Sequence, residues 1–187
     1  MHEDLKRKFD RVEEQKADLI ARVAARSDAE QTRTPRGGGW SPRALLHHLV
    51  LAEEQTLLHV AAAGAGPERV PASRRPLVAL LAGVMRAGVP LPAPPQMTPP
   101  DEANDLLPPD AAVARWDAAR RTLRERLEAV PPEDVRNSAP LAQHPIFGPL
   151  DACQVLDLLE AHLVYHARQA ARWGRGGSEG AGEKPAR

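Results

Sequence analysis

The chain is short of the residue types that mark several common classes of protein. Its only cysteine is Cys153, so no disulfide can form within the chain, as is usual in the reducing cytoplasm. Aromatic residues make up 3% of the sequence, too few for a surface that stacks on bases. The 25 basic and 25 acidic residues cancel, so the basic footprint of a nucleic-acid-binding protein is missing as well. We therefore expect neither a disulfide-rich scaffold nor a nucleic-acid partner.

Long apolar runs are also missing. The longest, residues 76–85, falls well below the roughly 20 residues that a helix needs to cross a bilayer. The first residues, Met1 to Asp4, include two acidic side chains and lack the apolar core of a signal peptide. These features predict a cytoplasmic protein without a membrane partner.

Helical periodicity is abundant. Apolar residues recur at three- and four-residue spacing, with charged residues between them. The predicted helices cover residues 3–26, 42–63, 76–87, 110–130 and 151–173. The third is short and the others are long, which predicts an all-α four-helix bundle with an additional short helix. We place the bundle domain at residues 1–174 and expect the glycine-rich, polar tail at 175–187 to be disordered.

Polar residues mark the expected starts of three of these helices. Ser41 is predicted as an N-cap, with Pro42 at the first helical position. Asp110 is the expected N-cap of the helix that it begins. Asp151 with Gln154 three residues on makes a variant of the capping box for the last helix.

Two connecting segments are expected to be irregular. Residues 27–39 end in three glycines and are predicted to form a loop. Residues 89–109 are so rich in proline that a helix cannot form there. The second segment is long enough to cover a pocket, although such segments are more often plain connections. No pattern typical of a β-hairpin is found.

The last helix carries the most informative pair of residues, His162 and His166, followed by Gln169. Imidazoles at i and i+4 project from one face of a helix and supply half of a tetrahedral metal site. All three side chains fall in the apolar arc of the helix, where polar groups are costly to bury unless something satisfies them. A metal ion is one answer, and a core hydrogen-bond network is another.

The second predicted helix offers candidates for a third ligand. Periodicity leaves His47, His48 and His59 open, since none of them lies at the centre of the apolar arc. Glu53 does lie at that centre. It could hold a ligand imidazole or act as a base near the metal. The alternative, which we favour, is a buried carboxylate paired with an arginine.

Three separated motifs then point to a known family. They are WSPxxLxxHLxxxE over residues 40–53, HPxFGPL over residues 144–150 and LxxHxxxHxxQ over residues 159–169. In this order they resemble the DinB-like superfamily, also called the DinB/YfiT-like metalloenzymes, which are small bacterial four-helix bundles. The resemblance covers roughly residues 10–173.

The resemblance implies a three-histidine site for one divalent ion, Zn²⁺ or Ni²⁺. Its first ligand stands eight residues after the tryptophan, which selects His48, and the last helix supplies His162 and His166. Gln169 is expected to support these ligands through its side chain, and Glu53 is the candidate for the same role if it is not paired with an arginine. The histidine of the second motif, His144, resembles a residue that shapes the turn and is not expected to be a ligand.

Three imidazoles leave a fourth position open, as in catalytic zinc sites. The resemblance therefore implies a metal-dependent hydrolase, or an S-transferase that uses a low-molecular-weight thiol, in each case acting on a small molecule. The sequence identifies no general base, and Cys153 lies off the ligand face. Arg168 and Arg172 could hold an anionic substrate, although arginines near a helix end more often complement the helix dipole. The other hypothesis is a non-enzymatic bundle stapled by the metal, with a stress-related or interaction role. Relatives suggest a homodimer.

Overall fold

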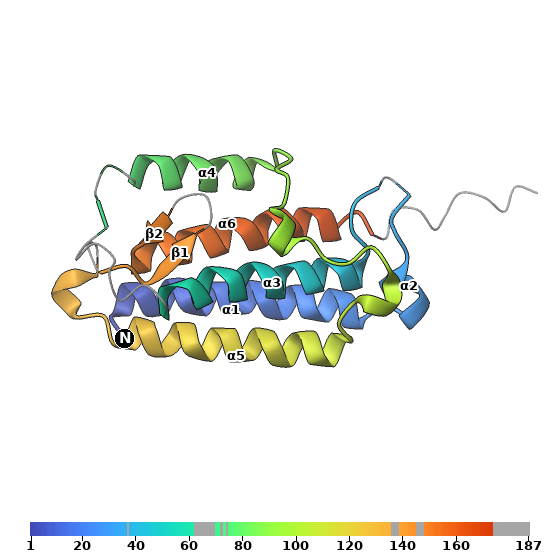
Figure 1. Cartoon of the computed structure of the whole chain (residues 1–187), viewed down its shortest axis with the longest axis horizontal. Helices are drawn as coiled ribbons and strands as arrows, with labels where there is room; N and C mark the ends of the chain where they lie inside the picture. Colours follow the sequence, from blue (N-terminus) through green and yellow to red (C-terminus); the bar gives the residue numbers. More distant parts are fainter. Residues whose placement is uncertain are drawn as a thin grey trace, which may run out of the picture.

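Four long helices form the body of the protein in the computed structural model (Figure 1). They are α1 (Glu3–Ala24), α3 (Pro42–Ala61), α5 (Pro109–Glu128) and α6 (Ala152–Ala170). The residues described are 1–36, 38–61, 70, 71, 73, 75–135, 139–144 and 148–173. The expected all-α bundle is confirmed. The expected tail lies outside the described residues, as do the last two residues of the helix predicted over 42–63.

The core lies between the apolar faces of the long helices. α1 packs on α6, α3 packs on α5, and α1 also contacts α3 and α5. The largest fully buried side chains are Trp116 of α5 and Phe9 of α1, with leucines of all four helices around them. Burying side chains of this size supplies most of the driving force for folding. Among the described helices, none is both long and apolar enough to cross a membrane.

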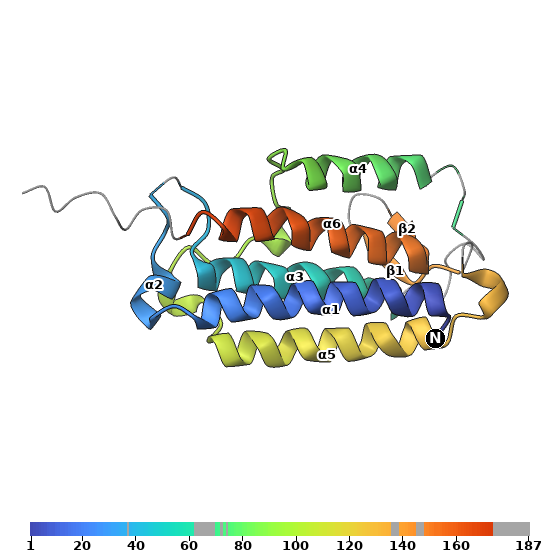
Figure 2. The same cartoon turned by 180° about the vertical axis from the view of Figure 1, so that it is seen from behind.

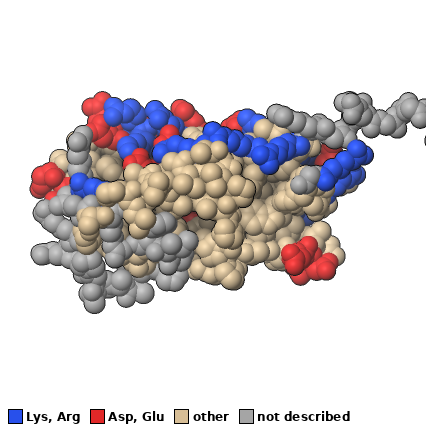
Figure 3. All heavy atoms as spheres, turned by 90° about the horizontal axis from the view of Figure 1, so that it is seen from above, with Lys and Arg blue, Asp and Glu red and all other residues tan. Residues whose placement is uncertain are grey.

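A shorter helix, α4 (Arg75–Ala87), lies outside the bundle along α6 (Figure 2). Its inner face buries Val78 and Ala82, while Leu77 and Leu80 point outward and are 53% and 65% exposed. Figure 3 looks onto this side of the molecule and shows a broad surface without charges, bordered by lysine and arginine side chains. α4 therefore has two apolar faces, only one of which is covered by α6.

Residues 88–108 connect α4 to α5, and we call them the strap. Gly88 opens it with φ of 78°, a conformation that favours glycine. The strap holds two short 3₁₀ helices, η2 (Pro95–Met97) and η3 (Ala103–Asp105). Our expectation of a segment without any helix was therefore too strict, because proline fits the first position of a single helical turn.

Two of the three expected helix starts are confirmed. The Ala44 amide donates to the Ser41 hydroxyl at 3.2 Å. Asp151 and Gln154 bond each other's backbone amides, both at 2.9 Å, which completes the capping box. The expectation for Asp110 was wrong. α5 begins at Pro109, whose fixed φ suits the first helical position.

Two elements were not expected. α2 (Asp28–Thr32) lies in the predicted loop and is closed by a capping box between Ser27 and Glu30. A small antiparallel hairpin pairs β1 (Ala142–His144) with β2 (Gly148–Leu150), and β1 packs against α3. The last helix ends at Ala170 and is followed by a turn that reaches Trp173, three residues beyond.

Candidate metal centre

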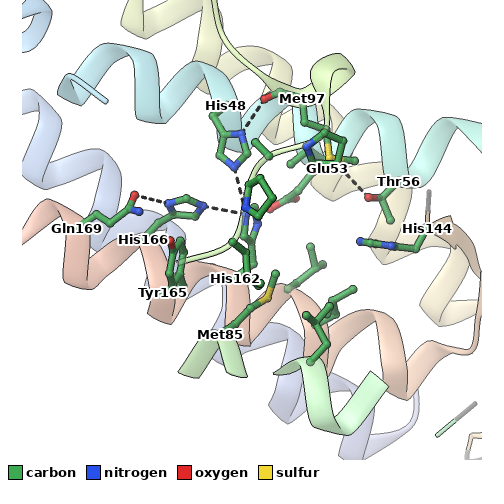
Figure 4. Close-up of a pocket in the computed structure, with 18 of the residues that line it drawn as sticks. His48, Glu53, Thr56, Met85, Met97, His144, His162, Tyr165, His166 and Gln169 are labelled. Carbon is green, nitrogen blue, oxygen red and sulfur yellow. Dashed lines mark hydrogen bonds between the residues drawn. The ribbon is translucent and has the colours of Figure 1, made fainter. Parts of the chain in front are cut away.

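Three histidines from two helices converge inside the bundle (Figure 4). His48 comes from α3, and His162 and His166 lie one turn apart on α6. The Nε2 atom of His162 is 2.8 Å from Nε2 of His166 and 3.2 Å from Nε2 of His48. All three ligand nitrogens lie within 4.8 Å of one another. The three residues that the resemblance selects are thus brought together.

The outer nitrogens of two of these rings bind carbonyl oxygens. The Nδ1 atom of His48 is 2.7 Å from the Met97 carbonyl oxygen, at the end of η2. The Nδ1 atom of His166 is 2.9 Å from the side-chain oxygen of Gln169. A carbonyl oxygen can only accept, so each Nδ1 carries the proton and each Nε2 presents its lone pair to the cluster. This is how metal-binding imidazoles are held in proteins.

The cluster is electrically neutral at pH 7. Burial lowers the pKa of His48 to about 4 and that of His166 to about 3. Burial, reinforced by the other histidines, also holds the pKa of His162 well below its usual value. Neutral imidazoles are the form that ligates a metal. Such rings need no proton removed before a cation binds.

Aromatic side chains pack against the cluster. The ring of Trp40, just before the N-cap of α3, lies 4.3 Å from the ring of His48 and 6.0 Å from that of His166. Tyr165 stands edge-on to His166 at 4.9 Å. The motif tryptophan therefore forms one wall of the site, a role that its position in the sequence did not reveal.

The neighbouring histidine, His47, faces the other way. Its Nδ1 accepts a hydrogen bond from the Leu107 amide at 3.3 Å. His144 lies on β1 at the wall of the same cavity as the cluster, and burial lowers its pKa to about 4. The side chain of His59 lies outside the described residues. Periodicity left both His47 and His48 open as the third residue of the cluster. In the structure His48 joins the cluster and His47 does not.

Glu53 is paired with an arginine, the alternative that we favoured. Its carboxylate accepts from Arg120 at 2.6 Å, and the two side chains are 1% and 2% exposed. Burial raises the pKa of Glu53, and the arginine opposes this shift. Among the described residues, no hydrogen bond joins Glu53 to the three histidines. Glu53 is nevertheless one of the residues that line the cavity.

Cys153 and the two arginines of the last turn lie away from the cluster. The Cys153 thiol donates to the Val135 carbonyl at 3.2 Å. Arg168 and Arg172 are exposed, and Arg168 lies beside Gly88 at the start of the strap. None of the three lines the cavity next to the histidines.

The histidines form one side of a cavity of about 450 Å³. α4 covers it with Leu81 and Met85, and the strap contributes residues 91–94 and Met97. Leu158 and Leu159 of α6 extend the apolar wall beyond the histidines. The strap therefore does cover a pocket. The contact between the Met97 carbonyl oxygen and His48 could not be predicted from the sequence, because every residue has a backbone carbonyl group.

Together the fold and the cluster define a class of protein, a helical bundle with three convergent histidines at the wall of a cavity. A model of the DinB superfamily matches residues 11–170 of the sequence. The chain therefore belongs to the DinB superfamily. Comparison with curated proteins and with solved structures gives no match.

Proposed function

We propose that the protein is a metal-dependent enzyme in which His48, His162 and His166 hold one divalent ion, Zn²⁺ or Ni²⁺. The observation that carries this proposal is the convergence of three Nε2 atoms, two of them fixed by a carbonyl oxygen on the opposite nitrogen. Imidazole suits both ions, and three protein ligands leave room for a further one. When bound, such an ion acts as a Lewis acid that lowers the pKa of a coordinated water or thiol.

The surroundings favour catalysis over a purely structural site. A structural metal is closed off by protein ligands, whereas this cluster faces a cavity. The mostly apolar lining makes the surroundings less polar than water and so strengthens electrostatic effects at the site. We infer a small-molecule substrate and a reaction of the hydrolase or thiol S-transferase type. Gln169 and the Met97 carbonyl orient the ligand rings.

Metal analysis of protein purified without an affinity tag tests this proposal. We expect about one Zn or Ni per chain, lost in His162→Ala while the helical circular dichroism signal is kept. His47→Ala is the matched control, because this neighbouring histidine faces Leu107 and not the cluster. It should retain the metal.

The other outcomes contradict the proposal in different ways. Metal-free wild-type protein that also fails to take up Zn²⁺ or Ni²⁺ would exclude a metal site. Unfolding of His162→Ala on loss of the ion, with His47→Ala intact, would show a structural staple in its place. Where the metal is bound, turnover of ester and amide substrates against thiol conjugates would separate hydrolase from transferase.

A further inference from the structure

The cavity beside the three histidines has almost no charge to offer a ligand. Among the described residues that line it, Glu53 is the only acidic one, and no lysine or arginine is present. The Glu53 charge is matched by Arg120 at 2.6 Å. Away from an ion held by the three histidines, an anionic group on a ligand would therefore meet no counter-ion in the described part of the wall.

Three arginines on or next to the helices that line the cavity do not contribute to its described lining. Arg86 of α4 binds Glu160 at 2.9 Å and so belongs to the outer surface. Arg168 is exposed beside Gly88, and Arg172 is exposed at the end of α6. These arginines are absent from the described cavity lining. The anionic substrate that the two arginines of the last turn suggested finds no support in this arrangement.

The rest of the described lining is mostly apolar. It includes Met85 and Leu81 from α4, Leu158 and Leu159 from α6 and the prolines of the strap. Thr56 is polar, but its hydroxyl donates to the Ala52 carbonyl at 2.7 Å. The volume lies within the range of about 300–1,000 Å³ that is usual for small-molecule sites.

Burying an ion in such a space without a partner costs far more than burying an apolar group gains. We propose that the site takes an uncharged molecule with a largely apolar body, whose one strongly polar group is the group that reaches the histidine cluster. This inference rests on the metal site proposed above. It disfavours thiols and esters that carry carboxylates, including highly charged low-molecular-weight thiols.

Two thiols of the same shape test the inference on cobalt-loaded protein. The probes are 4-methylbenzenethiol, whose ring carries a methyl group, and 4-mercaptobenzoate, whose carboxylate stands at the same position and cannot reach the metal. Their binding is followed by the thiolate-to-cobalt charge-transfer band. We expect 4-methylbenzenethiol to bind at least about tenfold more tightly to the wild type, since the carboxylate would be buried without a partner.

A charge placed in the wall should reverse this preference. Met85→Lys puts an ammonium group on the cavity face of α4, and we expect it to favour 4-mercaptobenzoate relative to the wild type. Leu80→Lys is the matched control, because it places the same charge on the outer face of the same helix. It should leave the ratio of the two affinities unchanged.

Failure of the inference and failure of the metal site give different results. If cobalt does not bind, its absence is measured before any thiol is added, and the proposed function falls. If cobalt binds and wild-type protein takes 4-mercaptobenzoate as tightly as the methyl compound or more so, the metal site stands and the inference is wrong. The wild-type comparison decides even if Met85→Lys does not fold.

Discussion

Each of two histidines in the cluster uses its ring nitrogens for different tasks. In His48 and His166 the Nδ1 atom donates to a carbonyl oxygen, and Nε2 points to the centre of the cluster. Proton position and ring orientation are thus fixed together, at the scale of a single side chain. For a residue that contacts Nδ1 of one of these histidines, the ability to accept a hydrogen bond should therefore matter as much as the size of its side chain.

Removing the acceptor behind His166 should weaken metal binding without unfolding the protein. In Gln169→Leu the Nδ1 proton loses its partner, and we expect affinity for Zn²⁺ to fall about 10- to 100-fold. Gln169→Glu keeps an acceptor and should keep the affinity. Competition with a chromophoric chelator measures both.

Arg168→Leu is the control for this substitution, because Arg168 is the adjacent residue, is exposed and lies away from the cavity. Its affinity for Zn²⁺ should match that of the wild type. If Gln169→Leu and Arg168→Leu bind the ion equally well, the amide does not hold the ligand ring.

Periodicity could predict the histidine pair of α6 but not its partner on α3. His47 and His48 are 7% and 3% exposed, so both are buried and burial alone does not distinguish them. The two histidines differ in their contacts. His47 accepts a hydrogen bond from a backbone amide of the strap, whereas His48 donates to a backbone carbonyl of the strap and contacts the cluster. Such a difference depends on tertiary structure, and only the motif that begins at Trp40 indicated it in the sequence.

At the scale of elements, the strap links the cavity cover to His48 of the histidine cluster. Its η2 turn is closed by bonds from the Met97 amide to Pro94 and from the Thr98 amide to Pro95, at 2.9 Å and 3.1 Å. The turn presents the Met97 carbonyl to His48. Because proline restricts φ, the turn is preorganised before the imidazole arrives.

Loosening this turn should therefore affect the metal site. Pro95→Gly should lower stability by roughly 1 kcal/mol through the greater freedom of the unfolded chain, and should also reduce Zn²⁺ affinity severalfold. Pro90→Gly is the matched control, since Pro90 is exposed in the same strap but outside the turn. Urea unfolding and chelator competition measure the two quantities. Equal Zn²⁺ affinities for the two variants would contradict a role for the turn.

The long helices were predictable because each repeats its apolar pattern over several turns. α2 was also within reach, since Ser27 and Glu30 have the spacing of a capping box. The hairpin was not. Its strands have three residues each, too few to show alternation, and it is held by the buried side chains of Ala142 and Leu150 and by packing on α3. The hairpin is therefore stabilised by tertiary contacts, which leave no local pattern in the sequence.

At the scale of the whole molecule, a cluster of buried neutral histidines makes stability depend on pH. In the unfolded chain a histidine takes up a proton below its ordinary pKa of about 6.5. In the folded protein His48 does so only near a pKa of about 4 and His166 near a pKa of about 3, because burial disfavours the charged ring. At pH values between the pKa of the folded protein and that of the unfolded chain, the unfolded chain binds more protons than the folded protein. A fall in pH through this range therefore favours unfolding.

The metal-free protein should accordingly lose stability well before its carboxylates titrate. In the presence of a chelator, we expect the free energy of unfolding to fall by roughly 1 kcal/mol per buried histidine between pH 7 and 5.5. Urea unfolding at a series of pH values measures this slope. His144→Gln removes one buried histidine without touching the cluster nitrogens, so its slope should be smaller by the share of that residue. A stability that stays constant over this range would mean that the folded protein takes up protons as readily as the unfolded chain. The lowering of the His48 and His166 pKa values by burial would then be contradicted.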